Sequence, residues 1–566
     1  MKQPWWRKSV VYQIYPKSFN DTTGNGVGDL QGIIEKLDYL KALGIDVIWL
    51  TPIYKSPQRD NGYDISDYFA IQEEYGTMED FDRLLEGAHS RGIKLIMDIV
   101  VNHTSTENEW FKQSRESKEN PFRDFYIWKD PKDGQEPNNW QSKFGGNAWK
   151  YDEKTGQYYL HLFDVTQADL NWENEEVRKR VYDMMTFWFE KGVDGFRLDV
   201  INLISKDQHF PDDDGSVPPH GDGRRFYTDG PRVHEFMHEM NQNVFSKYDS
   251  LTVGEMSSTT IDDCINYSNP DREELSMTFN FHHLKVDYPN GDKWTVADFD
   301  FHELKRILST WQVEMHKGGG WNALFWCNHD QPRIVSRYGD DGKYVTESAK
   351  MLATTIHMMQ GTPYIYQGEE IGMTNPKFED ISEYRDVESL NIYTIKNEQG
   401  MSNEQVIEIL KHKSRDNSRT PVQWNASEHA GFTSGTPWIN VAANYKTINA
   451  ENALEDKNSV FYHYQKLIRL RKEYDIITYG DYELLLEEDP QIFAYVRNGE
   501  NEKLLVVNNF YGTEASFEVP ESIGIEKYTT DLLISNYEDS QTDLSNGLSL
   551  RPYESVVFHL TLFSRV

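Results

Sequence analysis

The sequence predicts an α/β protein: a (β/α)8 TIM barrel with an inserted subdomain after the third strand and an antiparallel β domain at the C-terminal end. Two observations predict it, namely eight short runs rich in β-branched and aromatic residues and the helical segments that separate them. Continuous apolar runs of this length are typical of strands covered on both faces in a parallel sheet. The runs are Val10–Tyr15, Val47–Thr51, Lys94–Val101, Gly195–Val200, Leu251–Glu255, Met277–Phe281, Ala323–Cys327 and Pro363–Tyr366.

The clearest helical segment is Glu175–Lys191. Asn174 precedes it and is a suitable N-cap, because its side chain can accept a hydrogen bond from a backbone N–H of the first turn. Gly192 follows it and can end the helix in the left-handed conformation. Apolar residues fall on one stripe of this helix, as expected for a helix that packs on a barrel. They are Val177, Val181, Met184, Met185, Trp188 and Phe189.

Two stretches interrupt the alternation of strands and helices. From about residue 104 to residue 174 the chain is rich in Trp, Tyr, Asn, Gly and Lys and lacks a helical period. After residue 480 short alternating strands are expected at Tyr482–Leu486, Ile492–Arg497, Lys503–Asn508 and Ser555–Leu560. We therefore assign residues 1–103 and 175–479 to the barrel, 104–174 to an inserted B domain and 480–566 to a C-terminal β-sandwich-like domain.

Composition and charge exclude several classes of function. The chain has 566 residues, of which 38% are hydrophobic and 27% charged, and its formal net charge is −34. Such an acidic surface repels phosphate backbones and anionic lipids, so we expect neither a nucleic acid nor a membrane as partner. The aromatic content of 13% excludes a disordered chain and indicates large cores or aromatic-lined clefts.

The two cysteines, Cys264 and Cys327, are far apart and lack a pairing pattern, which argues against a disulfide scaffold or a cysteine-ligated zinc site. The first eight residues contain no apolar segment followed by a cleavage site. We therefore expect a cytoplasmic enzyme.

Polar residues gather at the C-terminal ends of the predicted strands, where barrel enzymes hold their catalytic groups. They are Asp98, Asn102 and His103 on the third strand and after it, Arg197 and Asp199 on the fourth, Glu255 on the fifth, and His329 and Asp330 after the seventh. The cluster has neither metal-type ligand spacing nor a nucleotide-binding loop. Carboxylates in such a group suit glycoside hydrolysis, in which one attacks the sugar carbon and another protonates the leaving oxygen.

Four blocks of this cluster resemble the α-amylase family of glycoside hydrolases. They are Asp98-Ile-Val-Val-Asn-His103, Gly195-Phe-Arg-Leu-Asp199, Gly254-Glu255 and Asn328-His329-Asp330. The resemblance implies a retaining double displacement, with Asp199 as nucleophile, Glu255 as general acid and base, and Asp330 holding sugar hydroxyls. A retaining mechanism requires the first two carboxyl groups to lie about 5–5.5 Å apart.

The same resemblance implies the residues that hold the substrate. Arg197 is expected to keep Asp199 ionised, and His103 and His329 to donate hydrogen bonds to glucose hydroxyls. The segment Asp60-Asn-Gly-Tyr63-Asp64 resembles a loop of exo-acting α-glucosidases, in which the counterpart of Asp60 meets an arginine, here Arg415, and Tyr63 stacks on the sugar. Val200 resembles the variants that favour α-1,6 or related links over α-1,4 links.

Three further stretches resemble the subgroup that hydrolyses phosphorylated α-(1,1)-glucosides: residues 222–231, 279–289 and 326–333. The second has a physical rationale, because phosphate needs charge-assisted donors and this stretch is basic within an acidic chain. We predict that His282, His283, Lys285 and Lys293 contact the phosphate, with Arg224 and Arg225 as further candidates. The expected substrate is a small phosphorylated disaccharide, cleaved to glucose and glucose 6-phosphate. Alternatives are an oligo-1,6-glucosidase or sucrose isomerase that acts on neutral sugars, and a relative that only binds sugars.

The segment from Asp21 to Asp29 resembles the calcium loop of the family. The predicted ligands are the side chains of Asp21, Thr23, Asn25 and Asp29 and the carbonyl of Val27. The alternative is a plain Gly-rich turn. No cofactor is expected for the chemistry, and a dinucleotide site is rejected because the third glycine of the loop falls too early.

His234-Glu-Phe-Met-His238 matches the HExxH signature of zinc peptidases. Both histidines would share one helical face, but the segment lies in the helix expected after the fourth strand and no third ligand follows at short spacing. We interpret it as a coincidence in an amphipathic helix.

Overall fold

A computed structural model describes residues 3–217 and 221–563, and a barrel of eight parallel strands forms its centre. The predicted apolar runs contain these strands to within one residue. The strands are β1 (Val11–Ile14), β2 (Val47–Leu50), β5 (Lys94–Ile99), β11 (Gly195–Leu198), β12 (Leu251–Glu255), β13 (Met277–Phe279), β14 (Ala323–Leu324) and β15 (Thr362–Tyr366). They lie side by side in chain order, and β15 pairs with β1. A parallel bridge between Thr278 and Asn322 joins β13 to the start of β14, so the predicted (β/α)8 fold is confirmed.

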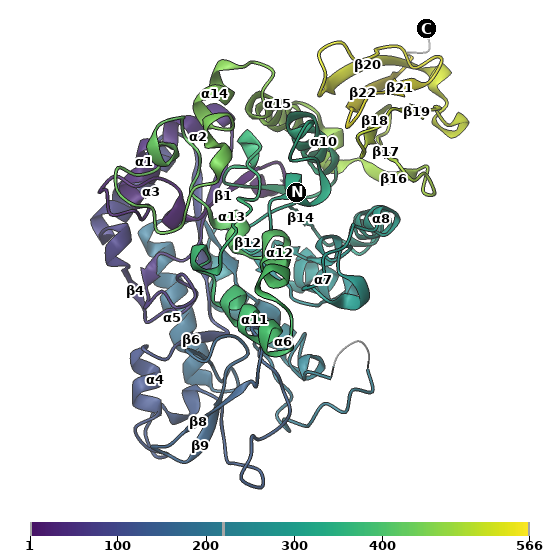
Figure 1. The fold of residues 1–566 in the computed structure, drawn as a ribbon. Coiled ribbons are helices and arrows are strands. Elements are labelled where there is room, and N and C mark those ends of the chain that lie inside the picture. Colours follow the sequence, from purple (N-terminus) through teal and green to yellow (C-terminus); the bar gives the residue numbers. More distant parts are fainter. Residues whose placement is uncertain (1–2, 218–220, 564–566) are drawn as a thin grey trace.

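Helices surround the barrel (Figure 1). The helix α5 has the predicted bounds: the Asn174 side chain accepts a hydrogen bond from the backbone N–H of Glu176, and Gly192 closes the helix with φ of +107°. The helices are α1 (Leu30–Glu35), α2 (Leu37–Leu43), α3 (Met78–Ser90), α4 (Glu109–Ser114), α5 (Glu175–Lys191), α6 (Val233–Asn243), α7 (Ile261–Ser268), α8 (Phe301–Lys317), α9 (Ile334–Tyr338), α10 (Val345–His357), α11 (Val387–Glu398), α12 (Asn403–Lys413), α13 (Asp416–Arg419), α14 (Ala450–Glu455), α15 (Val460–Glu473) and α16 (Asp475–Tyr479).

The stretch after β5 forms small antiparallel sheets at one end of the molecule, around β8 and β9 in Figure 1. Its strands are β6 (His103–Ser105), β7 (Trp128–Lys129), β8 (Trp149–Asp152), β9 (Gln157–Leu160) and β10 (Gln167–Asp169), and a shorter excursion after β2 contains β3 (Tyr54–Lys55) and β4 (Asp67–Ile71). Because β10 pairs with β6, Asp169 lies opposite His103 at the mouth of the barrel. The Gln167 side chain then donates a hydrogen bond to Asp60, with Nε2 at 3.0 Å from Oδ2.

The C-terminal residues form an antiparallel sheet at the opposite end, coloured yellow in Figure 1. Its strands are β16 (Asp481–Leu485), β17 (Ile492–Asn498), β18 (Glu502–Asn509), β22 (Ser555–Leu562) and β20 (Tyr528–Ser535), with β19 (Ala515–Phe517) and β21 (Leu548–Leu550) as a separate pair. Phe493 and Tyr495 join the core of the barrel, whereas Ala494 and Val496 face a second core. Tyr495 also donates a hydrogen bond to the carbonyl of Thr355 on α10 at 2.6 Å, so the sheet is docked on the barrel.

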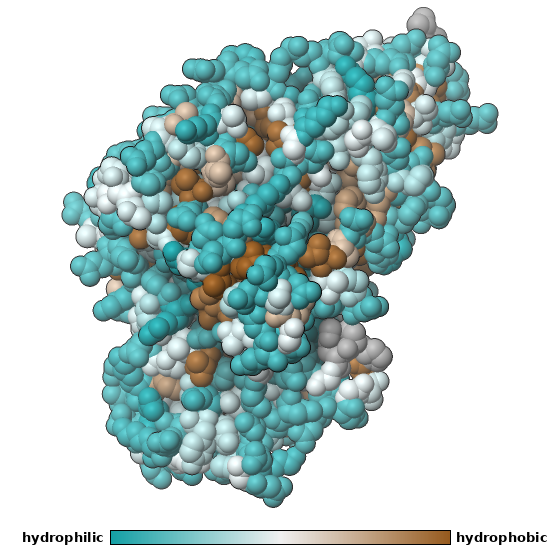
Figure 2. Space-filling view, viewed as in Figure 1, coloured by the Kyte–Doolittle hydropathy of each residue, from teal (hydrophilic) through white to brown (hydrophobic). Residues whose placement is uncertain are grey.

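Hydrophilic residues cover most of the face in Figure 2, and apolar residues gather in patches near its centre. Cys264 and Cys327 are buried and unbridged. Within the described residues, each helix is too short or too polar to cross a membrane.

Candidate active site

Arg197 on β11 is the centre of a group of buried carboxylates at the barrel mouth. Its Nη1 atom lies 2.9 Å from Asp98 Oδ1 and 2.6 Å from Asp199 Oδ1, and its Nη2 atom lies 2.7 Å from Glu255 Oε2. The three carboxylates come from β5, from the residue after β11 and from the end of β12. The parallel register of these strands brings them together, as the sequence predicted.

One guanidinium faces three carboxylates, and this arrangement affects the pKa values of Asp98 and Asp199. Burial raises the pKa of Asp199 well above its ordinary value; Arg197 opposes the rise, and Glu255 and Asp98 add to it. Burial also raises the pKa of Asp98 to about 6. Arg197 thus acts in the expected direction and burial acts against it, so the ionisation of Asp199 by Arg197 stays a prediction.

Asp199 and Glu255 line a cavity of about 190 Å³, which is comparable to the size of one sugar ring. Other predicted residues share its wall, namely Asp60, Tyr63, His103, Asp330 and Arg415. The predicted contact of Asp60 with Arg415 is present, with Oδ1 and Nη2 3.0 Å apart. Arg415 Nη1 also lies 3.3 Å from Asp330 Oδ1. The pairing of Arg415 with both carboxylates closes one side of the cavity.

The aromatic side of the cavity is built from Tyr63 and two histidines. The Tyr63 hydroxyl donates to Asp98 Oδ2 at 2.9 Å, and its ring stacks on His329 with centroids 4.9 Å apart. Burial lowers the pKa of His103 to about 4 and that of His329 to about 3, so both rings are neutral near pH 7. Arg197 and His329, which the resemblance placed on the substrate, lie behind the cavity wall and contact the residues that form it.

Val200 follows Asp199 in an unusual backbone conformation, with φ of 36° and ψ of 39°. This region is unfavourable for a β-branched residue. It aims the Val200 N–H at Glu255, with N and Oε2 3.0 Å apart. The side chain lines the cavity beside both predicted catalytic carboxylates.

A larger outer cavity of about 990 Å³ adjoins the inner one and shares Lys143, Lys293 and Glu388 with it. A third cavity of about 170 Å³ shares Glu255 and Asp330 with the inner cavity, and Lys285 with the outer one. The three spaces therefore form one path from the carboxylates to the surface.

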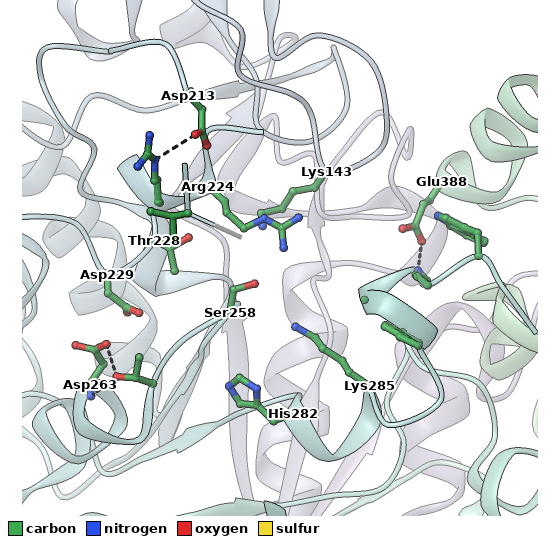
Figure 3. Close-up of a pocket in the computed structure, with 17 residues that line it drawn as sticks. Lys143, Asp213, Arg224, Thr228, Asp229, Ser258, Asp263, His282, Lys285 and Glu388 are labelled. Atoms are coloured by element: carbon green, nitrogen blue, oxygen red, sulfur yellow. Dashed lines mark hydrogen bonds and ion pairs between the residues drawn. The ribbon is translucent and has the colours of Figure 1, made fainter. Parts of the chain in front are cut away.

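Cationic side chains from distant segments meet in the outer cavity. In Figure 3, Lys143, Arg224 and Lys285 point toward its middle, and Asp229 and Asp263 lie on the other side. Burial lowers the pKa of Lys143 to about 7 and that of Lys285 to about 8, and the neighbouring Arg224 contributes to both shifts.

Among the four residues predicted to contact phosphate, Lys285, Lys293 and His282 line the outer cavity. Lys293 is paired with Glu388, with Nζ and Oε2 2.7 Å apart. His282 Nε2 lies 2.8 Å from the carbonyl of Thr259. The prediction for His283 is wrong: its Nε2 lies 2.8 Å from the carbonyl of Phe325 on the interior side of the turn, and burial lowers its pKa to about 4. Because His282 and His283 are consecutive, the turn directs them to different sides.

Three functional candidates were missed from the sequence. Lys143 lies in the irregular stretch after β5, where no period indicates which side chains point inward. Asp386 is a buried carboxylate that accepts hydrogen bonds from Arg415, with Oδ1 2.5 Å from Nη2, and Glu388 follows it on α11. A signal for Asp386 was available, since it caps the N-terminus of α11, but nothing in the sequence connects that cap with Arg415.

The predicted calcium loop is stabilised by its own hydrogen bonds. Asp21 Oδ1 accepts from the backbone N–H groups of Thr23 and Gly24, and Asn25 Oδ1 accepts from that of Val27. Asp29 caps α1 through Gly32. No group of three or more His, Cys, Asp or Glu residues suited to a metal ion occurs in the part of the chain that the structure describes. These contacts support the Gly-rich turn, and calcium binding stays a prediction.

The HExxH string lies on α6, as interpreted from the sequence. His234 Nδ1 lies 2.9 Å from Glu274 Oε2, and His238 Nδ1 lies 3.1 Å from the carbonyl of Arg272. Glu235 is paired with Arg232. Each side chain thus has a separate protein partner.

Comparison with known proteins identifies the family. Residues 13–480 match the model of the alpha amylase catalytic domain, and residues 492–557 match that of the alpha-amylase SusG C-terminal domain. The chain belongs to the α-amylase family. It is a glycoside hydrolase. Three of the four sequence blocks that resembled this family meet around Arg197, and the fourth supplies Asp330 to the wall of the same cavity.

Within the α-amylase family the chain is similar to enzymes with two kinds of substrate. It is 70% identical to the trehalose-6-phosphate hydrolase of Bacillus subtilis over 99% of this chain and 98% of that protein. It is 56% identical to the oligo-1,6-glucosidase of Parageobacillus thermoglucosidasius over 99% of this chain and 100% of that protein. The crystal structure of Bacillus licheniformis trehalose-6-phosphate hydrolase superposes with a TM-score of 0.94 at 71% identity, covering 99% of this chain and 100% of that one.

Proposed function

We propose that the protein hydrolyses trehalose 6-phosphate to glucose and glucose 6-phosphate. The observation that carries the proposal is the path from a cavity of about 190 Å³, lined by Asp199 and Glu255, to an outer cavity in which three cations converge. A neutral disaccharide needs no cations at its second sugar, whereas a phosphate dianion needs charge-assisted donors. The 70% identity to a trehalose-6-phosphate hydrolase supports the same substrate.

In the proposed mechanism, the inner cavity holds the unphosphorylated glucose. Asp199 attacks its anomeric carbon while Glu255 donates a proton to the glycosidic oxygen, which releases glucose 6-phosphate and leaves a glucosyl ester on Asp199. Glu255 then removes a proton from a water molecule that attacks the anomeric carbon of the ester, which frees the Asp199 carboxylate and releases glucose with its original anomeric configuration.

The contacts of Arg197 suit this mechanism. Asp199 attacks as a carboxylate, and Arg197 Nη1 lies 2.6 Å from its Oδ1, where it stabilises that charge. The Val200 N–H, 3.0 Å from Glu255 Oε2, fixes the orientation of the acid. Asp330, held by Arg415 and Arg419, is placed to accept hydrogen bonds from sugar hydroxyls.

At the other end of the path, the phosphate is proposed to contact Lys143, Arg224 and Lys285. These residues come from the inserted stretch, from the loop before α6 and from the turn after β13. Lys293 lies at the boundary of the inner and outer cavities, where Glu388 neutralises it, so we assign it to the bridging region between the two sugars.

The alternative is an oligo-1,6-glucosidase or sucrose isomerase that acts on neutral sugars, as the relative at 56% identity suggests. The deciding experiment compares kcat/KM of the purified protein on trehalose 6-phosphate, trehalose and isomaltose. We expect at least about a hundredfold preference for the phosphorylated sugar, which corresponds to roughly 3 kcal/mol of transition-state discrimination. Faster cleavage of isomaltose would overturn the proposal and leave the family and the catalytic carboxylates in place.

We also propose a cytoplasmic location. A phosphorylated disaccharide is charged and does not diffuse across a lipid bilayer, so an enzyme that consumes it is expected in the compartment where it is formed. Cell fractionation with an antibody against the protein tests this.

A further inference from the structure

Two lysines of the outer cavity, Lys143 and Lys285, have no carboxylate partner within 4 Å among the residues that the structure describes. Lys285 has no ion pair within 4 Å among residues 3–217 and 221–563. The hydrogen bond of Lys143 is to a neutral group, Ser257 Oγ at 3.3 Å, and its ammonium also lies 5.5 Å from the centroid of Tyr227. Arg224 pairs with Asp222, with Nη2 and Oδ2 2.6 Å apart.

The acidic side chains around these cations are paired with other residues, and not with Lys143 or Lys285. Asp213 pairs with Arg225 at 3.1 Å, and Glu388 pairs with Lys293. Glu255, the carboxylate of the inner cavity that acts on Lys143, contacts Arg197. On the far side of the cavity, Asp229 accepts from Tyr267 and Asn202, and Asp263 accepts from Thr260.

Burial and mutual repulsion therefore act on the two lysines together. Burial, followed by Arg224 and Lys285, lowers the pKa of Lys143 to about 7, against the opposing effect of Asp222 and Glu255. Burial and Arg224 lower the pKa of Lys285 to about 8. Burial lowers the pKa of His282, and Lys285 lowers it further. The His282 ring is therefore neutral near pH 7. An anion placed among these groups would remove the repulsion and favour the charged lysines.

We propose that the outer cavity is a phosphate site that works on its own: it takes up inorganic phosphate or a sugar phosphate, without a glucose unit in the inner cavity, and takes up a proton with it. This inference deepens the proposed function, on which it rests. Arg224 and Lys285 line the outer cavity and not the inner one, so an anion can reach them without a sugar beside Asp199. The released glucose 6-phosphate and free phosphate would then both inhibit by competing with the substrate.

The pH dependence of binding follows from the groups named above. The lysines lose their charge as the pH rises through about 7 to 8, so phosphate affinity falls above that range. A phosphate monoester loses its second negative charge below a pKa of about 6, so affinity falls there as well. Binding is expected to be tightest between about pH 6 and 8, and to be accompanied by uptake of about one proton per phosphate near pH 8.

The test is isothermal titration calorimetry of the full chain with inorganic phosphate, glucose 6-phosphate and glucose, each in several buffers of different ionisation enthalpy. We expect both phosphates to bind. Glucose 6-phosphate should bind with a buffer-dependent heat at pH 8 that is nearly absent at pH 6.5, and glucose should bind without such a heat. Lys285→Met and Lys143→Met should each weaken phosphate binding by about tenfold or more. Lys154→Met, at an exposed lysine of the same inserted stretch, is the matched control and should change nothing.

The two sources of phosphate are separated by the titration itself: binding of glucose 6-phosphate alone would mean that the sugar is required, and would overturn the autonomous site. Inorganic phosphate at about 10 mM should also slow the hydrolysis of trehalose 6-phosphate when the substrate concentration is below its KM. If it does not, the autonomous site is overturned as well. Circular dichroism and thermal unfolding of each lysine variant show that it has folded. Failure of the site while trehalose 6-phosphate is still hydrolysed leaves the proposed function intact, whereas phosphate binding without that hydrolysis contradicts the function and not the site.

Discussion

The inner and outer cavities treat charge in opposite ways. In the inner cavity the arginines are paired with carboxylates: Arg197 contacts Asp98, Asp199 and Glu255, and Arg415 contacts Asp60. In the outer cavity Lys143 and Lys285 have no carboxylate partner within 4 Å among the residues that the structure describes. The two cavities are adjacent, so their location in the fold does not explain why charges are paired in one and unpaired in the other.

This contrast teaches how one path can serve chemistry at one end and recognition at the other. Paired buried charges are held in fixed positions by several hydrogen bonds, which suits groups that must meet a transition state. Unpaired cations that repel one another are at higher free energy and gain most from a ligand of opposite charge. The following predictions test each half of the comparison.

The largest expected effect is on the nucleophile. Asp199→Asn should lower kcat on any accepted glucoside by about 10⁴-fold or more, because the amide cannot form the covalent ester. Circular dichroism should show an unchanged fold, since the asparagine can keep a contact with Arg197. Loss of only tenfold would contradict the double displacement.

The next effect is on stability of the inner cavity. Arg415→Met should lower the free energy of unfolding by about 3–5 kcal/mol, because it leaves Asp60 buried without its cation and Asp386 with only Arg419 at 3.7 Å. Thermal unfolding measures this as a large fall in Tm. Arg415→Lys keeps the charge and should recover part of the loss. If both variants are as stable as the parent, the paired charges do not hold this wall.

For the outer cavity, Lys285→Met is expected to lower kcat/KM for trehalose 6-phosphate by about 10- to 100-fold, as for loss of one charge-assisted contact of about 1.5–3 kcal/mol. Cleavage of an aryl α-glucoside should be unchanged, since that substrate does not reach the cations. Equal losses on both substrates would mean that Lys285 supports the inner cavity and not phosphate recognition.

The pH profiles of the two substrates should separate for the same reason. As the pH rises through about 7 to 8, Lys143 and Lys285 lose their charge, so KM for the phosphorylated sugar rises. The aryl glucoside has no phosphate for these lysines to bind, so its KM should lack this rise. Parallel KM profiles would contradict the role of the two lysines.

The smallest expected effect concerns the loop from Asp21 to Asp29. Because its side-chain oxygens accept hydrogen bonds within the loop, removal of Ca²⁺ with a chelator should shift Tm by no more than about 1–2 °C. A rise in Tm that saturates with added Ca²⁺, and not with Mg²⁺, would instead support the calcium prediction.

The sequence predicts regular parts of this molecule well and irregular parts poorly. The eight barrel strands were found because each lies in a continuous apolar run, and α5 because its apolar stripe and both caps agree. In the C-terminal sheet β20 was not found, since most of its residues are only partly buried or exposed, and the pair β19 and β21 was not found because each strand has three residues.

The same division applies to the site. Residues at strand ends, such as Asp199 and Glu255, could be placed because a parallel barrel brings all such ends to one side. Lys143 could not, because it lies in a loop whose path depends on tertiary contacts. His283 was wrongly placed because one residue decides which side of a turn a side chain faces. The pairing of Lys293 with Glu388 joins residues 95 positions apart, and no local pattern reports it.

The backbone at Val200 has a consequence for the evolution of this enzyme. A left-handed β-branched residue costs about 1–3 kcal/mol, and glycine at the same position would avoid that cost. Selection for stability alone would therefore remove valine from the residue next to the nucleophile. Its presence is consistent with a loss of folding stability in exchange for a rigid backbone that holds Glu255. Laboratory evolution toward heat resistance is therefore expected to replace Val200 early, and the replacement is expected to lower turnover.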